Sequence, residues 1–434
     1  MRRVVTTWWP LAASWLLMSF EMPALSAVVA RMPNPVINLA AYGGVVFPIA
    51  LIIESPIIML LAASTALSKD MASYLKIKRF MMISGGLLTV LHVLIAFTPM
   101  YYVVVEDILG VPQEIVEPAR LGLMIMLPWT WSIAYRRFNQ GMLIRFGHSQ
   151  TVGIGTMVRL STNLLILTIG YTNGNLPGIA VASGAVAFGV LCEAFYVGVV
   201  VRPVLKHQGQ VAPPVEPPLS WSAFYTFYLP LVMTSLLVLL ANPIGSAALS
   251  RMPYSLDSLA VWPVVTGIVF MLRSLGIAYN EVVVALLDEH GAYSNLKRFA
   301  TTLSVATTGL LLLVAATPLA SFWFGQISGL PPDLAQMAQR GLWFALPLPA
   351  LSVIQSWYQG ALLHGKRTGG IIESVVVYLI TSGIILGYGV AWGGAAGLYV
   401  GLIALAASVA TQTAWLGWRS QAILREIKEE ELAG

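Results

Sequence analysis

The sequence predicts an all-α polytopic membrane protein whose twelve transmembrane helices form two parallel six-helix repeats. Three observations lead to this prediction: a low charge content, apolar runs of 20 or more residues, and an internal repeat. Of 434 residues, 57% are hydrophobic and 10% are charged, whereas soluble domains carry about 25% charged residues. With a mean hydropathy of +0.79, the chain could not cover a soluble surface. Soluble enzymes and nucleic-acid-binding proteins are therefore excluded.

Hydropathy and loop punctuation place twelve spans, each suited to the roughly 20 residues that cross about 30 Å of hydrocarbon. Their approximate cores are residues 8–30, 38–66, 80–104, 119–143, 150–171, 177–201, 221–248, 259–286, 299–324, 338–362, 369–390 and 394–418. Several spans contain proline, which membrane helices tolerate and which often marks a kink near a cavity. We expect the N-terminal stretch to be the first span and not a cleaved signal peptide, because the repeat includes residues 26–33.

Residues 203–219 differ from the rest of the chain in carrying five prolines and several polar side chains. Because proline restricts the backbone, we expect a partly extended cytoplasmic linker here. The linker divides the chain into an N-terminal six-helix lobe, residues 1–202, and a C-terminal six-helix lobe, residues 220–434.

The two lobes repeat each other. Ser26–Pro33 reads SAVVARMP, and Ser246–Pro253, 220 residues later, reads SAALSRMP. Lys78-Arg79-Phe80 returns as Lys297-Arg298-Phe299 at an offset of 219. Further polar landmarks keep this offset within one residue over nearly 200 positions, which chance similarity of apolar runs would not do. Since each lobe has an even number of spans, the repeats are parallel, with a two-fold axis along the membrane normal.

Lys and Arg are concentrated on one side of these spans. If both termini are cytoplasmic, sixteen lie in cytoplasmic segments, Lys366 and Arg367 among them, and four lie outside. Cytoplasmic loops of membrane proteins carry such an excess. We therefore expect a multi-pass protein of the cell membrane, the inner membrane in a bacterium, with both termini cytoplasmic.

Catalytic and cofactor motifs are not found in the sequence. We find no P-loop or nucleophile elbow, and the five histidines are scattered without metal-ligand spacing. We therefore expect neither an enzyme nor a bound metal or cofactor.

Charges inside the apolar spans are the strongest functional signal, because a charge in mid-membrane is costly unless it is paired or hydrated. Arginine suits an anion site, since its planar fork makes two hydrogen bonds to a carboxylate or phosphate and keeps its charge. We assign seven residues to substrate binding in a water-filled cavity between the lobes: Arg273, Arg159, Arg137, Arg136, Asn163, Asn280 and Gln140. The alternative is that each arginine pairs with a glutamate as a structural tie, or extends to a lipid headgroup.

Three glutamates within spans, Glu21, Glu54 and Glu281, are candidates for binding a coupling ion, H⁺ or Na⁺. Glu21 lies two residues before Pro23, which frees backbone carbonyls. Glu54 aligns with Arg273 at an offset of 219, so opposite charges occupy equivalent positions. The alternatives are a protonated, hydrogen-bonded glutamate and a static ion pair.

Two arginines occupy equivalent positions near the outer ends of the first and seventh spans. These residues, Arg31 and Arg251, are assigned to an outer gate or to the helix ends. Amides such as Gln355 and Gln359 could line the cavity, although most intramembrane amides tie helices together.

Twelve spans in two parallel repeats, joined by a proline-rich linker, resemble the multidrug/oligosaccharidyl-lipid/polysaccharide (MOP) exporter superfamily, so the fold is expected to be MATE/MOP-like. Motifs in the N-terminal lobe resemble the progressive ankylosis protein (ANKH) family: Trp9-Pro10-Leu11, Leu39–Gly43, Glu54-Ser55-Pro56 and Gly141–Arg145. That resemblance implies export of organic anions, namely citrate-like carboxylates, nucleotides or pyrophosphate. This chain departs from the family in carrying Arg136 and Arg137 in the fourth span and in its short charged tail.

The expected function is alternating-access secondary transport that exports a small organic anion. The alternatives are a lipid-linked saccharide or lipid flippase, a MATE-type cation-coupled multidrug antiporter, and a membrane enzyme or scaffold without transport. The expected partners are the anionic substrate, the lipid bilayer and H⁺ or Na⁺, with no nucleic acid, and the chain is expected to be a monomer.

Overall fold

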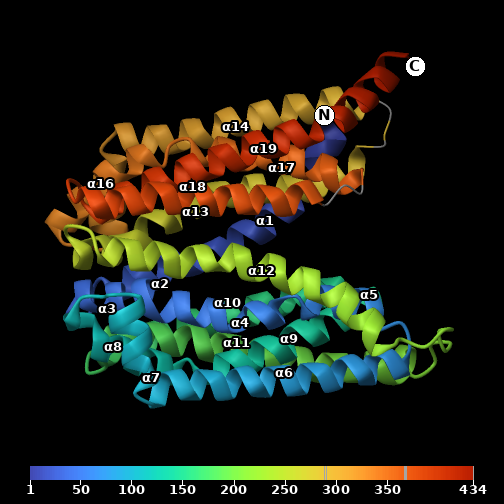
Figure 1. Ribbon diagram of the computed structural model, residues 1–434, viewed down its shortest axis with the longest axis horizontal. Coiled ribbons are helices and arrows are strands. Elements are labelled where there is room, and N and C mark those ends of the chain that lie inside the picture. Colours follow the sequence, from blue (N-terminus) through green and yellow to red (C-terminus); the bar gives the residue numbers. More distant parts are fainter. Residues whose placement is uncertain (288, 290, 366–368, 434) are drawn as a thin grey trace. The chain divides into compact units, whose positions relative to one another are not determined.

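A computed structural model describes residues 1–287, 289, 291–365 and 369–433, and the described chain is almost entirely helical (Figure 1). Lys366 and Arg367, counted above among the cytoplasmic charges, lie outside the described residues. The helices and π-helical segments of the first repeat are α1 (Arg2–Ser19), α2 (Glu21–Val29), α3 (Pro35–Ala41), η1 (Tyr42–Val46), α4 (Phe47–Ile58), α5 (Leu60–Leu67), α6 (Met71–Phe97), α7 (Met100–Tyr102), η2 (Val103–Ile108), α8 (Gln113–Ile125), α9 (Leu127–Arg145), α10 (Ser149–Asn173), α11 (Gly178–Val204) and η3 (Leu205–Gly209).

The second repeat follows the same course with fewer breaks, with nine elements against fourteen among the described residues. These elements are α12 (Trp221–Ser250), α13 (Ser255–Leu286), α14 (Ala292–Ala316), α15 (Leu319–Ser321), η4 (Phe322–Ile327), α16 (Pro332–Phe344), α17 (Leu348–His364), α18 (Gly369–Trp392) and α19 (Gly397–Ala433). The backbone repeats in detail, since Asn34 and Tyr254 both adopt φ of 54°. The two lobes therefore share local geometry as well as hydropathy.

Ten of the predicted spans coincide with helices that are long and apolar enough to cross a membrane. The other two, predicted at 119–143 and 338–362, are each broken into two helices, α8–α9 and α16–α17. The breaks lie directly before Pro128 and around Pro347, because proline has no N–H to donate to the preceding turn.

The third and ninth spans begin earlier than predicted. α6 starts at Met71, where 80 was expected, and α14 starts at Ala292, where 299 was expected. Both helices begin before their basic residues. The low hydropathy of these residues left the first turns outside the predicted spans. Each ends before a Thr-Pro pair, Thr98-Pro99 in α6, because the residue before proline avoids helical geometry.

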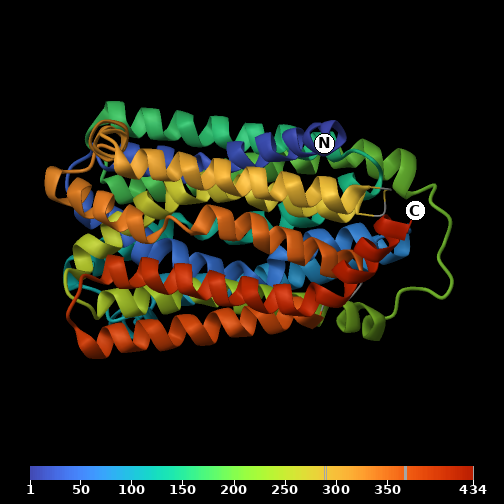
Figure 2. The same cartoon turned by 90° about the horizontal axis from the view of Figure 1, so that it is seen from above.

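The helices cluster into two compact units. Unit 1 combines Met1–Ala30 with the chain from Ala248 onward, and unit 2 is Arg31–Ala247. Within each unit the long helices run side by side (Figures 1 and 2). The first helix of each repeat is thus grouped with helices of the other repeat, so the units do not follow the repeat boundaries, and lobes at 1–202 and 220–434 remain a prediction.

In unit 1, α1 packs on α13, α14 and α17 through an apolar core. Val4 is buried in this core together with Tyr279, Phe299 and Val353, and Trp8 packs against it. The Trp8 indole N–H donates to the Leu275 carbonyl at 3.0 Å. An indole donor needs such a partner when it leaves water.

In unit 2, α12 packs on α4 near Pro56. The Ser235 hydroxyl donates to the Ser55 carbonyl at 2.7 Å, and the Tyr228 hydroxyl donates to the Pro56 carbonyl. Within α4, the Pro56 nitrogen has no proton to donate to the Ile52 carbonyl, and the Ser55 hydroxyl donates to this carbonyl instead, at 2.8 Å. Two backbone carbonyls of α4 therefore hold α12.

Asp70 connects the linker to the start of α6. Its carboxylate caps the helix by accepting from the Ser73 amide at 2.8 Å, and it also accepts from the Val215 amide at 3.0 Å. The hydrogen bonds from Ser73 and Val215 hold the pKa of Asp70 below its usual range. The Lys76 ammonium donates to the Leu219 carbonyl, so the end of the linker is also fixed to α6.

We expect the attachment of the linker to weaken in acid. A carboxylate with a lowered folded-state pKa stabilises the fold fully above its unfolded pKa of about 3.9, and this contribution is lost as the pH falls through the folded-state value. The protection of the Val215 amide against hydrogen exchange, relative to an unfolded peptide at the same pH, should therefore fall below about pH 4. In Asp70→Ala this protection should be low at every pH, and protection equal to that of the wild type would contradict the assignment.

Candidate functional site

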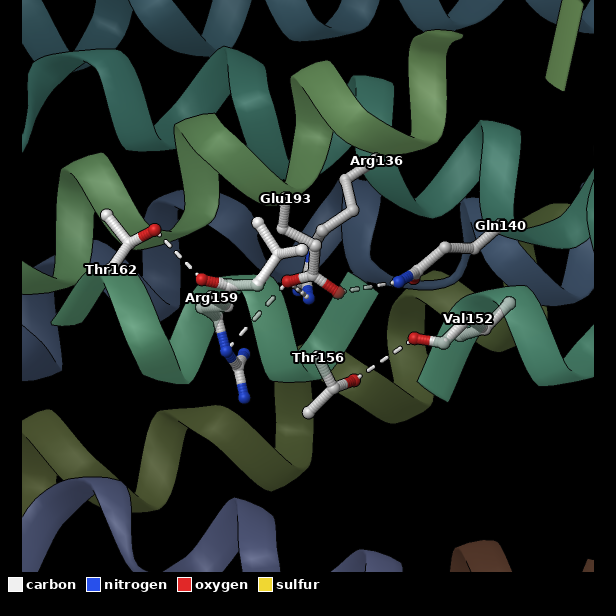
Figure 3. Close-up of polar contacts among 8 residues, drawn as sticks. Arg136, Gln140, Val152, Thr156, Arg159, Thr162 and Glu193 are labelled. Carbon is white, nitrogen blue, oxygen red and sulfur yellow. Dashed lines mark hydrogen bonds and ion pairs between the residues drawn. The ribbon is translucent and has the colours of Figure 1, made fainter. Parts of the chain in front are cut away.

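A buried carboxylate organises the charged residues of unit 2. Glu193 on α11 is fully buried, and its Oε2 lies 2.6 Å from Nη1 of Arg136 and 3.8 Å from Nε of Arg159. Its Oε1 accepts from the Gln140 amide at 2.9 Å. Figure 3 shows Glu193 among these three side chains, which come from α9 and α10.

Close packing of α10 against α11 brings the residues around Glu193 together. Asn163 on α10 is buried, and a Cβ atom built on Gly189 of α11 would lie only 1.6 Å from its Oδ1. Only glycine allows α10 and α11 to approach this closely, and that approach brings Arg159 and Glu193 within reach of each other.

A second buried carboxylate belongs to the same unit. Glu54 on α4 is 4% exposed, and its Oε2 has no hydrogen-bond partner among the described residues. Arg137, Arg136 and Arg159 lie within electrostatic range of it. Arg137 is half-buried, and its Nε also lacks a hydrogen-bond partner in the described part of the chain. The group therefore joins three arginines to two glutamates, one positive charge in excess when all are ionised.

Unit 1 contains a polar pocket with a volume of about 270 Å³. Its lining comes from α1, α13 and α17: Trp15, Arg273, Ile277, Asn280, Glu281, Ser352, Gln355, Ser356 and Gln359. Nε of Arg273 donates to the Ser352 hydroxyl at 2.8 Å, and the Asn280 amide donates to the Ser356 carbonyl at 3.3 Å. Among the described residues, no carboxylate forms an ion pair with Arg273.

The pocket unites three of the residues assigned from the sequence, Arg273, Asn280 and Glu281. Sequence reasoning missed Trp15, Ser352 and Ser356. The two serines could have been found, because Ser352, Gln355, Ser356 and Gln359 recur at the i, i+3, i+4, i+7 spacing of one helix face. Nothing in the sequence indicated Trp15, whose position depends on α1 packing beside α13.

The two repeats place polar residues at equivalent positions but differ in the charge of these residues. At the offset of 219, Gln355, Ser356 and Gln359 on α17 align with Arg136, Arg137 and Gln140 on α9. In the second helix of each repeat, Arg273 aligns with Glu54. In the first repeat, the fourth span is therefore basic at these positions and the second span carries the acid. In the second repeat, the fourth span is neutral at these positions and the second span carries an arginine.

The remaining assigned residues lie apart from these two groups. Glu21 is the first residue of α2 and is half-buried, directly after the break at Phe20 that divides the predicted first span. Arg31 and Arg251 are exposed in the turns after α2 and α12. The structure brings neither arginine into the polar pocket.

No family model and no curated protein match this sequence, but solved structures match it over nearly its whole length. An inward-facing multidrug resistance MATE family transporter of the MOP superfamily has a TM-score of 0.69 at 17% identity, covering 94% of this chain and 95% of its own. The lipid II flippase MurJ, inward closed, has a TM-score of 0.69 at 14% identity, covering 98% and 91%. A MOP superfamily transporter from Pyrococcus furiosus, described as having a binding pocket of reverse polarity, has a TM-score of 0.58 at 16% identity, covering 97% and 96%.

At these identities the likeness shows the fold. The all-helical, MATE/MOP-like fold predicted from the repeat is confirmed. Together with the ten long apolar helices among the described residues, this fold makes the chain a multi-pass membrane protein. The closer likeness to the ANKH family stays a prediction.

Proposed function

We propose that this chain is an alternating-access secondary transporter that exports a small organic anion. The observation that carries the proposal is Arg273, which lines a polar pocket and bonds to a hydroxyl group. A guanidinium without a carboxylate partner keeps an unneutralised charge, which attracts an anion in a region of low dielectric. The hydroxyl and amide groups around it supply further hydrogen bonds to an oxygen-rich ligand.

The charge balance of unit 2 supports the same proposal. Arg136 and Arg159 share Glu193, whereas Arg137 lies near Glu54 and its Nε–H donates to none of the described residues. The excess positive charge favours an anion and disfavours the cationic substrates expected of an acidic cavity. The resemblance to the ANKH family narrows the proposed substrates to citrate-like carboxylates, nucleotides or pyrophosphate.

Two alternatives come from the structural neighbours. One neighbour is named a lipid II flippase, and an anionic lipid-linked substrate would need the same arginine. Another is named a multidrug resistance transporter, which would correspond to a cation antiporter. The cell-membrane location, the cytoplasmic termini and the monomeric state stay predictions.

A panel of ligands tests the proposal on the purified protein. Citrate, malate, ATP, pyrophosphate, a lipid-linked saccharide and a cationic dye are each added, and the unfolding temperature is measured. Binding to the folded state stabilises it by about 2.7 kcal/mol at a ligand concentration of 100 Kd. Stabilisation by at least one soluble anion supports the proposal, and stabilisation by the cationic dye alone would contradict it.

Glu281 is expected to weaken anion binding through its negative charge. It lies eight residues after Arg273 on the same helix, about 12 Å away along the axis, and it lines the same pocket. Glu281→Gln removes this charge, so the affinity for an anion bound at Arg273 should rise, by about tenfold over that distance at an effective dielectric constant near 20. Equilibrium binding of the anion identified in the ligand panel measures the change.

The matched control is Glu373→Gln, which removes an exposed carboxylate that pairs with Arg419 in the same unit. This variant should keep the anion affinity of the wild type. Anion affinity in Glu281→Gln equal to that of the wild type would exclude Glu281 from the site.

A further inference from the structure

A second cavity in unit 1 lies at the end where α14 begins and α17 ends. It has a volume of about 660 Å³ and is lined by α14, α17 and α19. Three cations line it, Lys297, Arg425 and Lys428, and none of the described acidic side chains does. Among the residues that the structure describes, none of the three forms an ion pair. This cavity shares no lining residue with the pocket that contains Arg273.

The cavity changes in character along its length. Lys428 and Ala410 on α19 both line it, and their separation of eighteen positions corresponds to about 27 Å of helix. Along α19 the lining runs from Lys428 and Arg425 past Trp418 to Ala414 and Ala410, while on α14 Lys297 lies one turn further in than Tyr293. A ligand that fits this order has an anionic head, an interfacial region and an apolar tail.

Aromatic side chains lie beside the cations of this cavity. Tyr293 and Trp357 contact each other with ring centroids 5.6 Å apart, and the Lys297 ammonium lies 5.9 Å from the Tyr293 ring. Tyr and Trp are enriched at the level of lipid headgroups. Basic residues beside a membrane helix attract anionic lipids.

We propose that this cavity binds an anionic phospholipid of the adjacent leaflet. The phosphate lies among Lys297, Arg425 and Lys428, and one acyl chain follows the groove past Ala414 toward Ala410. The site goes beyond the transport proposal, because its ligand is a component of the bilayer and its residues are not those of the Arg273 pocket.

The two repeats differ at this groove in a way that supplies matched variants. At the offset of 219, Lys297 aligns with Lys78, and Arg425 aligns with Lys206. Lys78 also lies over an aromatic ring, at 5.8 Å from Tyr74. Ala414, however, aligns with the large, exposed Phe195. The first repeat therefore keeps two of the three cations, with Gly209 in place of Lys428, and has a bulky residue where the second has a small one.

Binding of phosphatidylglycerol to the purified full chain in detergent tests the proposal, with phosphatidylcholine as the neutral probe. The triple variant Lys297→Gln, Arg425→Gln, Lys428→Gln should bind phosphatidylglycerol on the order of a hundredfold more weakly, since each basic residue near an anionic surface is worth about 1 kcal/mol, or about fivefold. The control triple variant Lys78→Gln, Arg202→Gln, Lys206→Gln removes the same charge from the first repeat and should bind as the wild type does.

Ala414→Phe distinguishes a lipid from a free phosphate. It fills the groove and keeps all three cations, so phosphatidylglycerol should bind at least tenfold more weakly while unfolding stability is unchanged. Equal loss of binding in both triple variants would overturn the site. Undiminished binding in Ala414→Phe, together with displacement by soluble glycerol phosphate, would show a phosphate site and overturn the lipid assignment. Both readouts measure binding, so a failure of anion transport leaves them unaffected.

Discussion

Arg273→Ala is expected to weaken anion binding by roughly 10- to 150-fold, because hydrogen bonds to a charged group are worth about 1.5–3 kcal/mol. The variant removes the guanidinium from the polar pocket and leaves the Ser352 hydroxyl, which a water molecule can satisfy. Equilibrium binding of the anion identified in the ligand panel measures the change. Arg273→Lys keeps the charge without the planar fork, so its anion affinity should lie between those of the wild type and Arg273→Ala.

Arg419→Ala is the matched control for this experiment. Arg419 belongs to the same unit and pairs with Glu373 at 3.0 Å, with both side chains about two-fifths exposed. Exposed pairs contribute about 0–1 kcal/mol to stability, so the fold and the anion affinity should be kept. Anion affinity in Arg273→Ala equal to that of the wild type would remove Arg273 from the site.

Glu193→Ala is expected to cause the largest loss of stability, about 3–5 kcal/mol, because it leaves buried arginines without their carboxylate. Arg136, Arg159 and Gln140 would all lose a partner at once. Thermal unfolding of the purified protein measures the change. Glu373→Ala, which removes an exposed carboxylate, should change stability by less than about 1 kcal/mol.

The other repeat supplies a compensating variant. At the offset of 219, Gln355 and Gln412 stand where the first repeat has Arg136 and Glu193. The double variant Arg136→Gln, Glu193→Gln should therefore recover part of the stability that Glu193→Gln alone loses, because a neutral amide pair replaces an unpaired charge. A double variant as unstable as the sum of its single changes would show that the two residues do not act as a pair.

The fold was readable from the sequence because its signals are local or repeated. Apolar runs mark ten of the spans, and landmarks such as Lys78-Arg79 and Lys297-Arg298 keep the two repeats in register. The breaks before Pro128 and around Pro347 follow from a missing N–H at a known residue. Hydropathy alone treats each of these segments as continuous, so it predicted one span where the structure has two helices.

Contacts between distant helices could not be read in this way. The grouping of α1 with the second repeat depends on side chains such as Trp8 finding a carbonyl far along the chain. The pairing of Arg136 with Glu193 joins helices 57 residues apart, and no feature of either segment specifies the other. Arg273 is different, because the sequence around it offers no acid until Glu281, and the structure describes no ion pair for it.

Efflux from proteoliposomes tests the transport proposal most directly. Vesicles loaded with labelled citrate, ATP or pyrophosphate, and separately with a cationic dye, are compared for the wild type, Arg273→Ala and Arg419→Ala. We expect protein-dependent efflux of at least one anion, retained in Arg419→Ala and reduced at least tenfold in Arg273→Ala. Efflux of the dye without any anion, or anion efflux in Arg273→Ala at the wild-type rate, would contradict it.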